Sequence, residues 1–201
     1  GGSTAFSTTS EVAFITVTDV NDAPVASIVP SGYGLNEDDS ARLLSSISVA
    51  DVDAGASDIS ATVSVNDGVL NLSTTTGLTF TGGANGSATM TVEGTVSELN
   101  AALATLTYQP NLNFNGADSL TLLVDDLGNT GGGSLTSMDS AAITVTAVND
   151  AAELDLDFDD SGATGNDFAT TFVEGLGPVN LVDADSVLSD VDNTNLVSIT
   201  V

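Results

Sequence analysis

Three observations predict an all-β protein with one short helix. Of the 201 residues, 41% are hydrophobic and only 4% are aromatic, so the candidate core is mostly aliphatic. The apolar segments are short, and most alternate with polar residues, as in antiparallel strands that bury one face. Gly, Ser, Thr, Asn and Asp separate these segments, which is the composition of turns between strands. A chain with this apolar content is able to bury a core, and we expect it to fold.

A repeated phrase divides the chain into units. The sequence ITVTDVND at residues 15–22 returns as ITVTAVND at residues 143–150. The repeat predicts three units, which are the last strand of a preceding domain with its linker over 1–22, a complete β-sandwich over 23–149, and a linker with the first strands of a next domain over 150–201.

Within the complete unit, alternation predicts nine strands. Asn66–Gly68 reads Asn-Asp-Gly between two of them, which is a signal for a tight β-hairpin turn. A further strand, belonging to the preceding domain, is expected at 11–18. The nine strands are expected near residues 25–29, 42–50, 59–66, 68–73, 77–81, 87–93, 105–109, 118–125 and 139–147.

One segment departs from strand alternation. Residues 95–104 read TVSELNAALA, in which Thr95 and Glu98 have the spacing of a helix capping box. We expect a single short helix here, crossing between the sheets, with a structural role. Its buried face would consist of Leu99, Ala102 and Leu103.

The charge balance excludes several classes of function. The chain has 28 acidic residues and one basic residue, Arg42, with no Lys and no His. A nucleic-acid partner is excluded because phosphates require clustered Lys and Arg, and an anionic membrane surface is disfavoured for the same reason. No apolar stretch approaches the roughly 20 residues that cross a bilayer, so we expect no direct membrane insertion. Without His, Cys or Lys the usual catalytic bases and nucleophiles are missing, and we expect no enzyme activity.

The acidic residues gather where predicted strands end. Asp51-Val-Asp53 follows one strand and returns as Asp190-Val-Asp192. Two carboxylates about 5 Å apart repel by roughly 3 kcal/mol at an effective dielectric constant near 20, which is large beside a total stability of about 5–15 kcal/mol. Because the chain has one Arg, the compensating charge must come from solution. Oxygen ligands of this kind fit Ca²⁺; the alternative is a solvated acidic rim that aids solubility.

These motifs together resemble one family. DVNDAPV (19–25) is similar to the linker of cadherins, in the shortened form found in cadherin-like repeats of large bacterial surface adhesins that leave the cell by type I secretion. DVDAG (51–55) resembles the Asp-x-Asp motif of the domain that follows such a linker. VDDLGNTG (124–131) resembles a later turn that returns to the same ions, and residues 106–126 resemble the second half of those repeats. The resemblance implies an all-β fold of tandem cadherin-like or immunoglobulin-like Greek-key β-sandwiches.

The resemblance also implies the calcium ligands. The second linker has alanines where the first has Asp19 and Pro24, so we expect it to be weaker or more flexible. At the first junction the implied ligands are Asp19, Asn21, Asp22, Asp51, Asp53 and one of Asp125 or Asp126. At the second junction they are Asn149, Asp150, Asp190 and Asp192, with Glu37 reaching down from the complete domain; the alternative for Glu37 is that it faces the loops of its own domain.

A family of this kind implies a mechanical function. We expect a secreted, extracellular extender repeat of a cell-surface adhesin or filament, serving cell adhesion or biofilm, in which Ca²⁺ fixes the angle between neighbouring domains. The expected partners are adjacent repeats of the same chain and, in a filament or lateral association, other copies of it.

Two alternative functions stay open. A glycan- or peptide-binding module needs an exposed aromatic platform, for which Tyr33 is the best candidate. The strand at 11–18 and the C-terminal strands could also meet between molecules and build a filament by strand donation.

The acidic run Asp155–Asp160 requires a separate interpretation. Its alternating carboxylates resemble the start of an EF-hand loop, but Asp160 and Asn166 stand where that loop needs Gly and Glu. An acidic strand face or a looser ion site is therefore the better interpretation.

Overall fold

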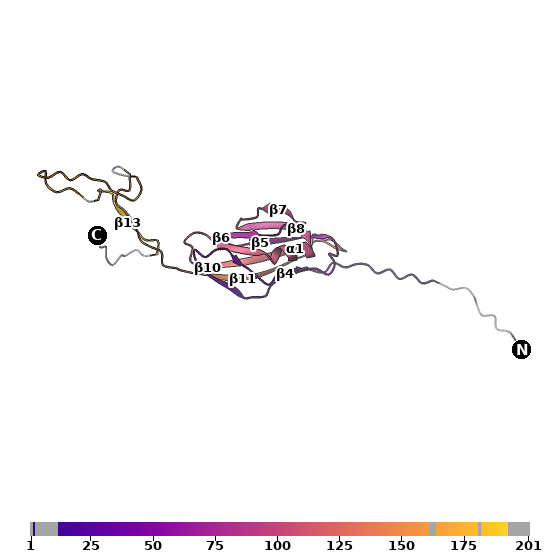
Figure 1. The fold of residues 1–201 in the computed structure, drawn as a ribbon. Coiled ribbons are helices and arrows are strands. Elements are labelled where there is room, and N and C mark those ends of the chain that lie inside the picture. The colour runs from indigo at the N-terminus through magenta and orange to yellow at the C-terminus, as the bar shows by residue number, and fades with distance from the viewer. Residues whose placement is uncertain (1, 3–11, 161–163, 181, 193–201) are drawn as a thin grey trace.

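Strands β1 to β11 and helix α1 lie within residues 25–146 and share one hydrophobic core, and we call this part of the chain the body. The computed structural model describes residues 2, 12–160, 164–180 and 182–192. Apart from α1, every regular element among these residues is a β-strand, which confirms the predicted all-β class with one short helix. Figure 1 shows the body in the centre, with the chain entering at one end and leaving at the other.

A six-stranded sheet forms one layer of the body. Side chains alternate across it, so that Leu120, Leu122 and Val124 of β10 are fully buried. Neighbouring strands are antiparallel, except that β2 and β11 are parallel. The order across the sheet is β2 (Gly32–Asn36), β11 (Thr136–Thr146), β10 (Gly116–Asp125), β5 (Asp58–Ser64), β8 (Thr89–Thr95) and β7 (Thr79–Gly83).

The opposite layer consists of two smaller sheets and the helix. In one sheet β1 (Val25–Ile28) pairs with β4 (Ile47–Ala50). In the other, β9 (Leu106–Pro110) lies between β3 (Arg42–Leu43) and β6 (Gly68–Leu72). Their apolar side chains join the inward face of the six-stranded sheet in a single cluster. Full burial of one large aliphatic side chain is worth about 1.5–3 kcal/mol, so this core can hold the body together without a disulfide.

Helix α1 (Val96–Leu103) confirms the prediction for this segment in detail. The Thr95 side chain accepts a hydrogen bond from the N–H of Glu98, and the Glu98 carboxylate accepts one from the N–H of Thr95 at 3.0 Å. This reciprocal pair satisfies two backbone donors at the helix start and fixes where α1 begins. The helix buries the expected face, Leu99, Ala102 and Leu103.

The turn at Asn66–Gly68 is not the hairpin that the sequence predicted. The strands on either side, β5 and β6, belong to different sheets and do not pair with each other. The buried Asp118 carboxylate accepts hydrogen bonds from the backbone N–H groups of Asn66 and Asp67, at 2.9 and 3.0 Å. Gly68 lies so close to Tyr108 that a Cβ would be 2.5 Å from the ring. Asp118 and the close packing against Tyr108 hold the backbone here, so the chain crosses from one layer to the other instead of forming a hairpin.

Two other strand predictions need correction. The expected strand at 42–50 is divided into β3 and β4, because Ser46 has a positive φ of 64° and the two halves pair with different strands. Strand β2 was not predicted, because two glycines among its five residues resemble a turn. The remaining predicted strands of the body are present, with ends that differ by a few residues.

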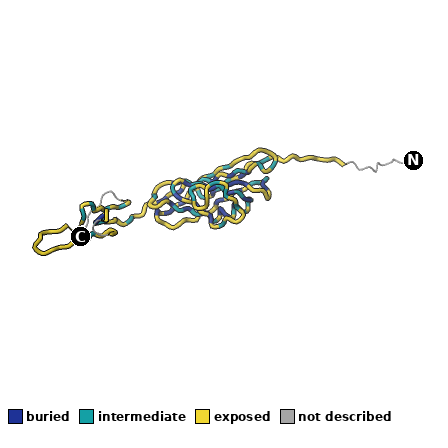
Figure 2. The backbone as a smooth tube through the Cα atoms, turned by 90° about the horizontal axis from the view of Figure 1, so that it is seen from above, coloured by how far each residue is buried: buried dark blue, intermediate teal, exposed yellow. Residues whose placement is uncertain are grey.

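Outside the body, the described part of the chain has little regular structure. Residues 12–18 form no strand among the described residues, contrary to the prediction for 11–18, because no neighbouring strand pairs with them; residue 11 lies outside the described part. Beyond the body, β12 (Glu153–Asp155) pairs with β13 (Val187–Ser189). Figure 2 shows both end segments largely exposed, in contrast to the body. No helix in the described part of the chain has the length and apolarity needed to span a membrane.

Candidate metal centre

The linker that precedes the body contacts the Asp-Val-Asp loop after β4. The backbone N–H of Asp22 donates a hydrogen bond of 2.6 Å to Oδ2 of Asp53. Oδ1 of Asp51 accepts from the N–H groups of Asp53 and Ala54, at 2.8 and 2.9 Å, which holds the loop in a tight turn. The structure thus brings the Asp51–Asp53 loop against the linker at Asp22.

Asp126, at the end of β10, binds the same linker from another side. Its side chain is 1% exposed, and its Oδ2 accepts a 2.7 Å hydrogen bond from Nδ2 of Asn21. Its Oδ1 accepts from the N–H groups of Gly128 and Leu135, both at 2.8 Å. Burial acts to raise the pKa of Asp126, but these hydrogen bonds outweigh burial and the pKa lies below its ordinary value. The neighbouring Asp125 instead accepts hydrogen bonds from the loop that follows β10.

That loop, rich in glycine, passes directly against the linker. At Gly131, which has a φ of +69°, a Cβ would lie 2.4 Å from the carbonyl oxygen of Asp19. The Asn21 side-chain amide also donates to the carbonyl oxygen of Gly133, at 3.0 Å. The first junction therefore brings together the predicted residues from three separate segments of the chain. Within it, the Asp125 carboxylate binds the loop after β10, and Asp19 contacts that loop through its backbone.

The linker after the body repeats the contact of the first linker. The N–H of Asp150 donates to Oδ2 of Asp192, and the N–H of Asp192 donates to Oδ1 of Asp190 at 2.9 Å. At the first junction the donor was Asp22, which stands at the same position of its Asn-Asp motif. The side-chain amide of Asn149 donates to the carbonyl oxygen of Asp150, at 2.8 Å. These hydrogen bonds link all four residues that were predicted here together with Glu37, namely Asn149, Asp150, Asp190 and Asp192.

Glu37 ties the second linker to the body. Its side chain is 2% exposed, and Oε1 accepts a 2.7 Å hydrogen bond from the N–H of Val148. Oε2 accepts from Nδ2 of Asn115, at 2.9 Å. Glu37 therefore contacts both a loop of its own body and the linker, and the structure places it at the second junction.

One carboxylate oxygen at the second junction has no hydrogen-bond partner. Oδ2 of Asp150 is buried, and no donor among the described residues reaches it. Burial raises the pKa of this carboxyl group, and the negative charge of nearby carboxylates raises it further. In decreasing order of effect, these carboxylates are Asp38, Asp192, Glu37 and Asp190.

Asp38 was not predicted as a site residue, although it directly follows Glu37. Its backbone has a positive φ of 62°, which takes the chain sharply away from β2. Asp38 and Asp150 both line an open hollow of about 590 Å³, together with residues 109–113. The hollow is large enough to hold water molecules around a cation at this junction. The run of three acidic residues at 37–39 was the sequence signal that could have identified Asp38 as a site residue.

A second cluster of acidic residues was only partly predicted from the sequence. Four carboxylates beside β12 and β13 lie close together, and we call them the hairpin cluster: Asp157, Asp159, Asp183 and Asp185. The run 155–160 was considered as an ion site, but Asp183 and Asp185 were not. Their alternate spacing, the same as in Asp-Val-Asp, was the signal that could have found them.

Tyr33, the residue considered for an exposed aromatic platform, does not form one. Its side chain is 7% exposed, and its hydroxyl group donates a 2.8 Å hydrogen bond to the carbonyl oxygen of Ser45. Burial raises the pKa of this hydroxyl group. Tyr33 belongs to the core of the body.

No protein-family model matches this chain, and searches of curated proteins and of solved structures find no match to it. Its function must therefore be inferred from the geometry of the two junctions.

Proposed function

We propose that this chain is a calcium-rigidified extender repeat of a long secreted surface adhesin or extracellular filament. Calcium at the two junctions would fix how the body is oriented relative to the segments on either side. The chain would act as a spacer that carries mechanical load and would catalyse no reaction.

One observation carries the proposal, which is that the same contact occurs at both ends of the body. At each end an aspartate of an Asn-Asp motif donates its backbone N–H to the second carboxylate of an Asp-Val-Asp motif. In each Asp-Val-Asp motif the first carboxylate accepts from the N–H of the second aspartate. A solvated acidic rim has no reason to repeat this arrangement, whereas a chain of similar units would form it at every junction.

The placement of the two junctions fits a linear assembly. Both views show the N-terminal segment and the C-terminal segment leaving opposite ends of the body. Units joined in this way extend in one direction, so the stiffness of each junction determines the stiffness of the whole chain.

The residues present suit a calcium ion better at the second junction than at the first. At the first junction, the carboxylates of Asp51, Asp53 and Asp126 already accept hydrogen bonds from backbone or side-chain amides. At the second, no donor in the described part of the chain reaches the buried Oδ2 of Asp150, and other carboxylates lie near it. Asp150, Asp190, Asp192 and Glu37 would hold the ion there. When bound, calcium would supply the positive charge that relieves their mutual repulsion.

We also propose a more specific fold for the body, which is a cadherin-like Greek-key β-sandwich. It is supported by the two layers of the body and by residues 25–36, which pair with β4 in one layer and then with β11 in the other. A strand that changes sheets in this way joins the layers along their edge.

Extracellular calcium-binding modules have dissociation constants of about 10⁻⁴–10⁻³ M, so such junctions would be occupied outside a cell.

Thermal unfolding of two matched variants tests the proposal. Asp150→Asn with Asp192→Asn removes two charges at the junction, and Asp167→Asn with Glu174→Gln removes two charges from exposed positions of the same segment. In about 10 mM CaCl₂ a single site should stabilise the native protein by about 1.4–2.7 kcal/mol. The junction variant should lose this stabilisation, and in EGTA it should melt no lower than the native protein. Equal calcium responses of native protein and both variants would refute the proposal.

A further inference from the structure

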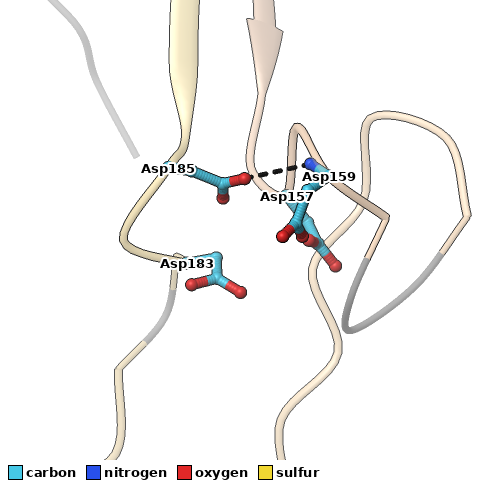
Figure 3. Close-up of side chains that lie close together, drawn as sticks. All are labelled: Asp157, Asp159, Asp183 and Asp185. Carbon is cyan, nitrogen blue, oxygen red and sulfur yellow. Dashed lines mark hydrogen bonds between the residues drawn. The ribbon is translucent and has the colours of Figure 1, made fainter.

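The hairpin cluster is assembled by the pairing of two short strands. Asp155 of β12 pairs with Val187 of β13. Asp157 and Asp159 follow β12 along the chain, and Asp183 and Asp185 precede β13, so the pairing brings two loops to the same end of this small sheet. Figure 3 shows the two loops side by side, with two of the four carboxylates on each.

We infer that the hairpin cluster is a third cation site, with oxygen ligands and a spacing that suit a hard divalent ion such as Ca²⁺. Each of the four residues offers a carboxylate oxygen, and these four oxygens lie within 4.8 Å of one another. Calcium binds oxygen ligands at about 2.3–2.6 Å, so two ligands on opposite sides of one ion are about 4.6–5.2 Å apart. The four oxygens are therefore spaced so that one ion can contact them all.

An orphaned oxygen supplies an independent indication of a ligand. Oδ2 of Asp185 accepts a 3.0 Å hydrogen bond from the N–H of Asp159. Oδ1 of the same carboxylate is buried, and it has no hydrogen-bond partner among the residues that the structure describes. A buried carboxylate oxygen that faces other carboxylates is strongly unfavourable unless a cation binds it. The single basic residue, Arg42, belongs to β3 in the body and is exposed there.

The burial pattern of this segment points to the same conclusion. Among the described residues of 150–192, Asp157 is the only one that is buried, and its exposed fraction is 0%. A small unit normally buries apolar side chains at its centre, and small units without such a core are commonly held together by a metal ion or disulfides. The chain has no cysteine. A bound ion would therefore take the place of a core here.

The backbone around the cluster is already shaped for this role. The N–H of Asp183 donates to the carbonyl oxygen of Leu156 at 2.9 Å, which joins the two loops next to the carboxylates. The N–H of Asp160 donates to the carbonyl oxygen of Asp157 at 3.0 Å, which turns the first loop back. The ligands come from two loops that are distant in sequence, and this arrangement differs from the single continuous loop of an EF-hand.

The third site is independent of the two junctions and does not require the proposed extender function. It predicts that calcium acts directly on the two loops that carry the hairpin cluster, in addition to any effect on the linkers. A calcium titration of the ¹⁵N-labelled 201-residue chain, followed by NMR, separates these effects because each amide reports on its own site.

In the native chain, the amide signals of Asp159 and Ala184 should shift on addition of CaCl₂ and reach saturation. In the Asp183→Asn, Asp185→Asn variant these shifts should need at least about tenfold more calcium, since the charge of the ligands sets the affinity. The amide of Asp150 should respond in this variant as it does in the native chain. Asp167→Asn, which removes an exposed carboxylate of the same segment, should leave all the shifts unchanged.

The titration of the native chain keeps the inference testable if the double variant does not fold. If the amides of Asp159 and Ala184 stay unchanged in about 10 mM CaCl₂, the concentration that saturates extracellular sites, the third site is refuted. If they shift but the amide of Asp150 does not, the third site stands and the junction proposal fails. If they shift with the same midpoint in the native chain and in Asp183→Asn, Asp185→Asn, these two carboxylates are not ligands and the inference is overturned.

Discussion

Gly131, in the loop after β10, lies against the first linker, and replacing it with alanine should weaken the junction. The backbone φ is +69°, a left-handed conformation that costs a residue with a Cβ about 1–2 kcal/mol. The new Cβ would lie 2.4 Å from the carbonyl oxygen of Asp19, so the linker must also move away. Loss of the hydrogen bond from Asn21 to Gly133 would add about 0.5–1.5 kcal/mol. The expected total is a destabilisation of about 1.5–3.5 kcal/mol.

Gly133→Ala is the matched control for this change. Gly133 is in the same loop, its φ lies outside the left-handed region, and an added Cβ would meet no atom within 4 Å. Urea unfolding followed by far-UV circular dichroism should show a shift of less than about 0.5 kcal/mol for this control. Gly131→Ala should lower the midpoint with an unchanged slope. If the two variants are equally stable, the loop does not hold the linker in the way that we describe.

Two further predictions concern the buried Asp118, whose carboxylate accepts hydrogen bonds from Asn66, Asp67, Tyr108 and Ser119. Asp118→Ala should destabilise the body by about 3–5 kcal/mol, because several buried donors lose their acceptor; urea unfolding at neutral pH measures this, and a loss below about 1 kcal/mol would contradict the role of the carboxylate as anchor of the crossing. Burial acts to raise the pKa of Asp118, but the hydrogen bonds outweigh it and the pKa is lowered in the folded protein. Its contribution to stability is therefore fully present above the unfolded-state pKa of about 3.9 and is lost as the pH falls through the lower folded-state pKa. Unfolding measured between about pH 5 and 2 should show a steeper loss for the native chain than for Asp118→Asn, which has no carboxyl group to protonate; parallel curves would contradict this assignment.

Much of the body follows from local sequence patterns. Strand alternation predicts most of β4 to β11, because each of these strands buries one face against a common core. The capping box at Thr95 and Glu98 predicts where α1 begins, because both hydrogen bonds are made within four residues. The repeated Asn-Asp and Asp-Val-Asp motifs predict which segments meet at the junctions, because they occur twice in the same order.

The features that sequence patterns did not predict depend on contacts between distant residues. The chain crosses between layers at Asn66–Gly68 because of Asp118, which is about fifty residues away along the chain. Similarly, Asp157 and Asp183 meet only because the three-residue strands β12 and β13 pair. Strands this short leave no periodic signal in a sequence. Tyr33 was misassigned because its neighbouring glycines resemble a turn, whereas in β2 it alternates with them and faces the core.

Small-angle X-ray scattering of the 201-residue chain, in millimolar CaCl₂ and then in EGTA, tests the central claim most directly. We predict a narrow distribution of interatomic distances in calcium, because the linkers are then fixed at both ends of the body. In EGTA the distribution should broaden. The distribution of the Asp150→Asn, Asp192→Asn variant in calcium should lie between those of the native chain in calcium and in EGTA, because this variant keeps the first junction. Scattering profiles that superimpose with and without calcium would contradict the claim that calcium stiffens the junctions.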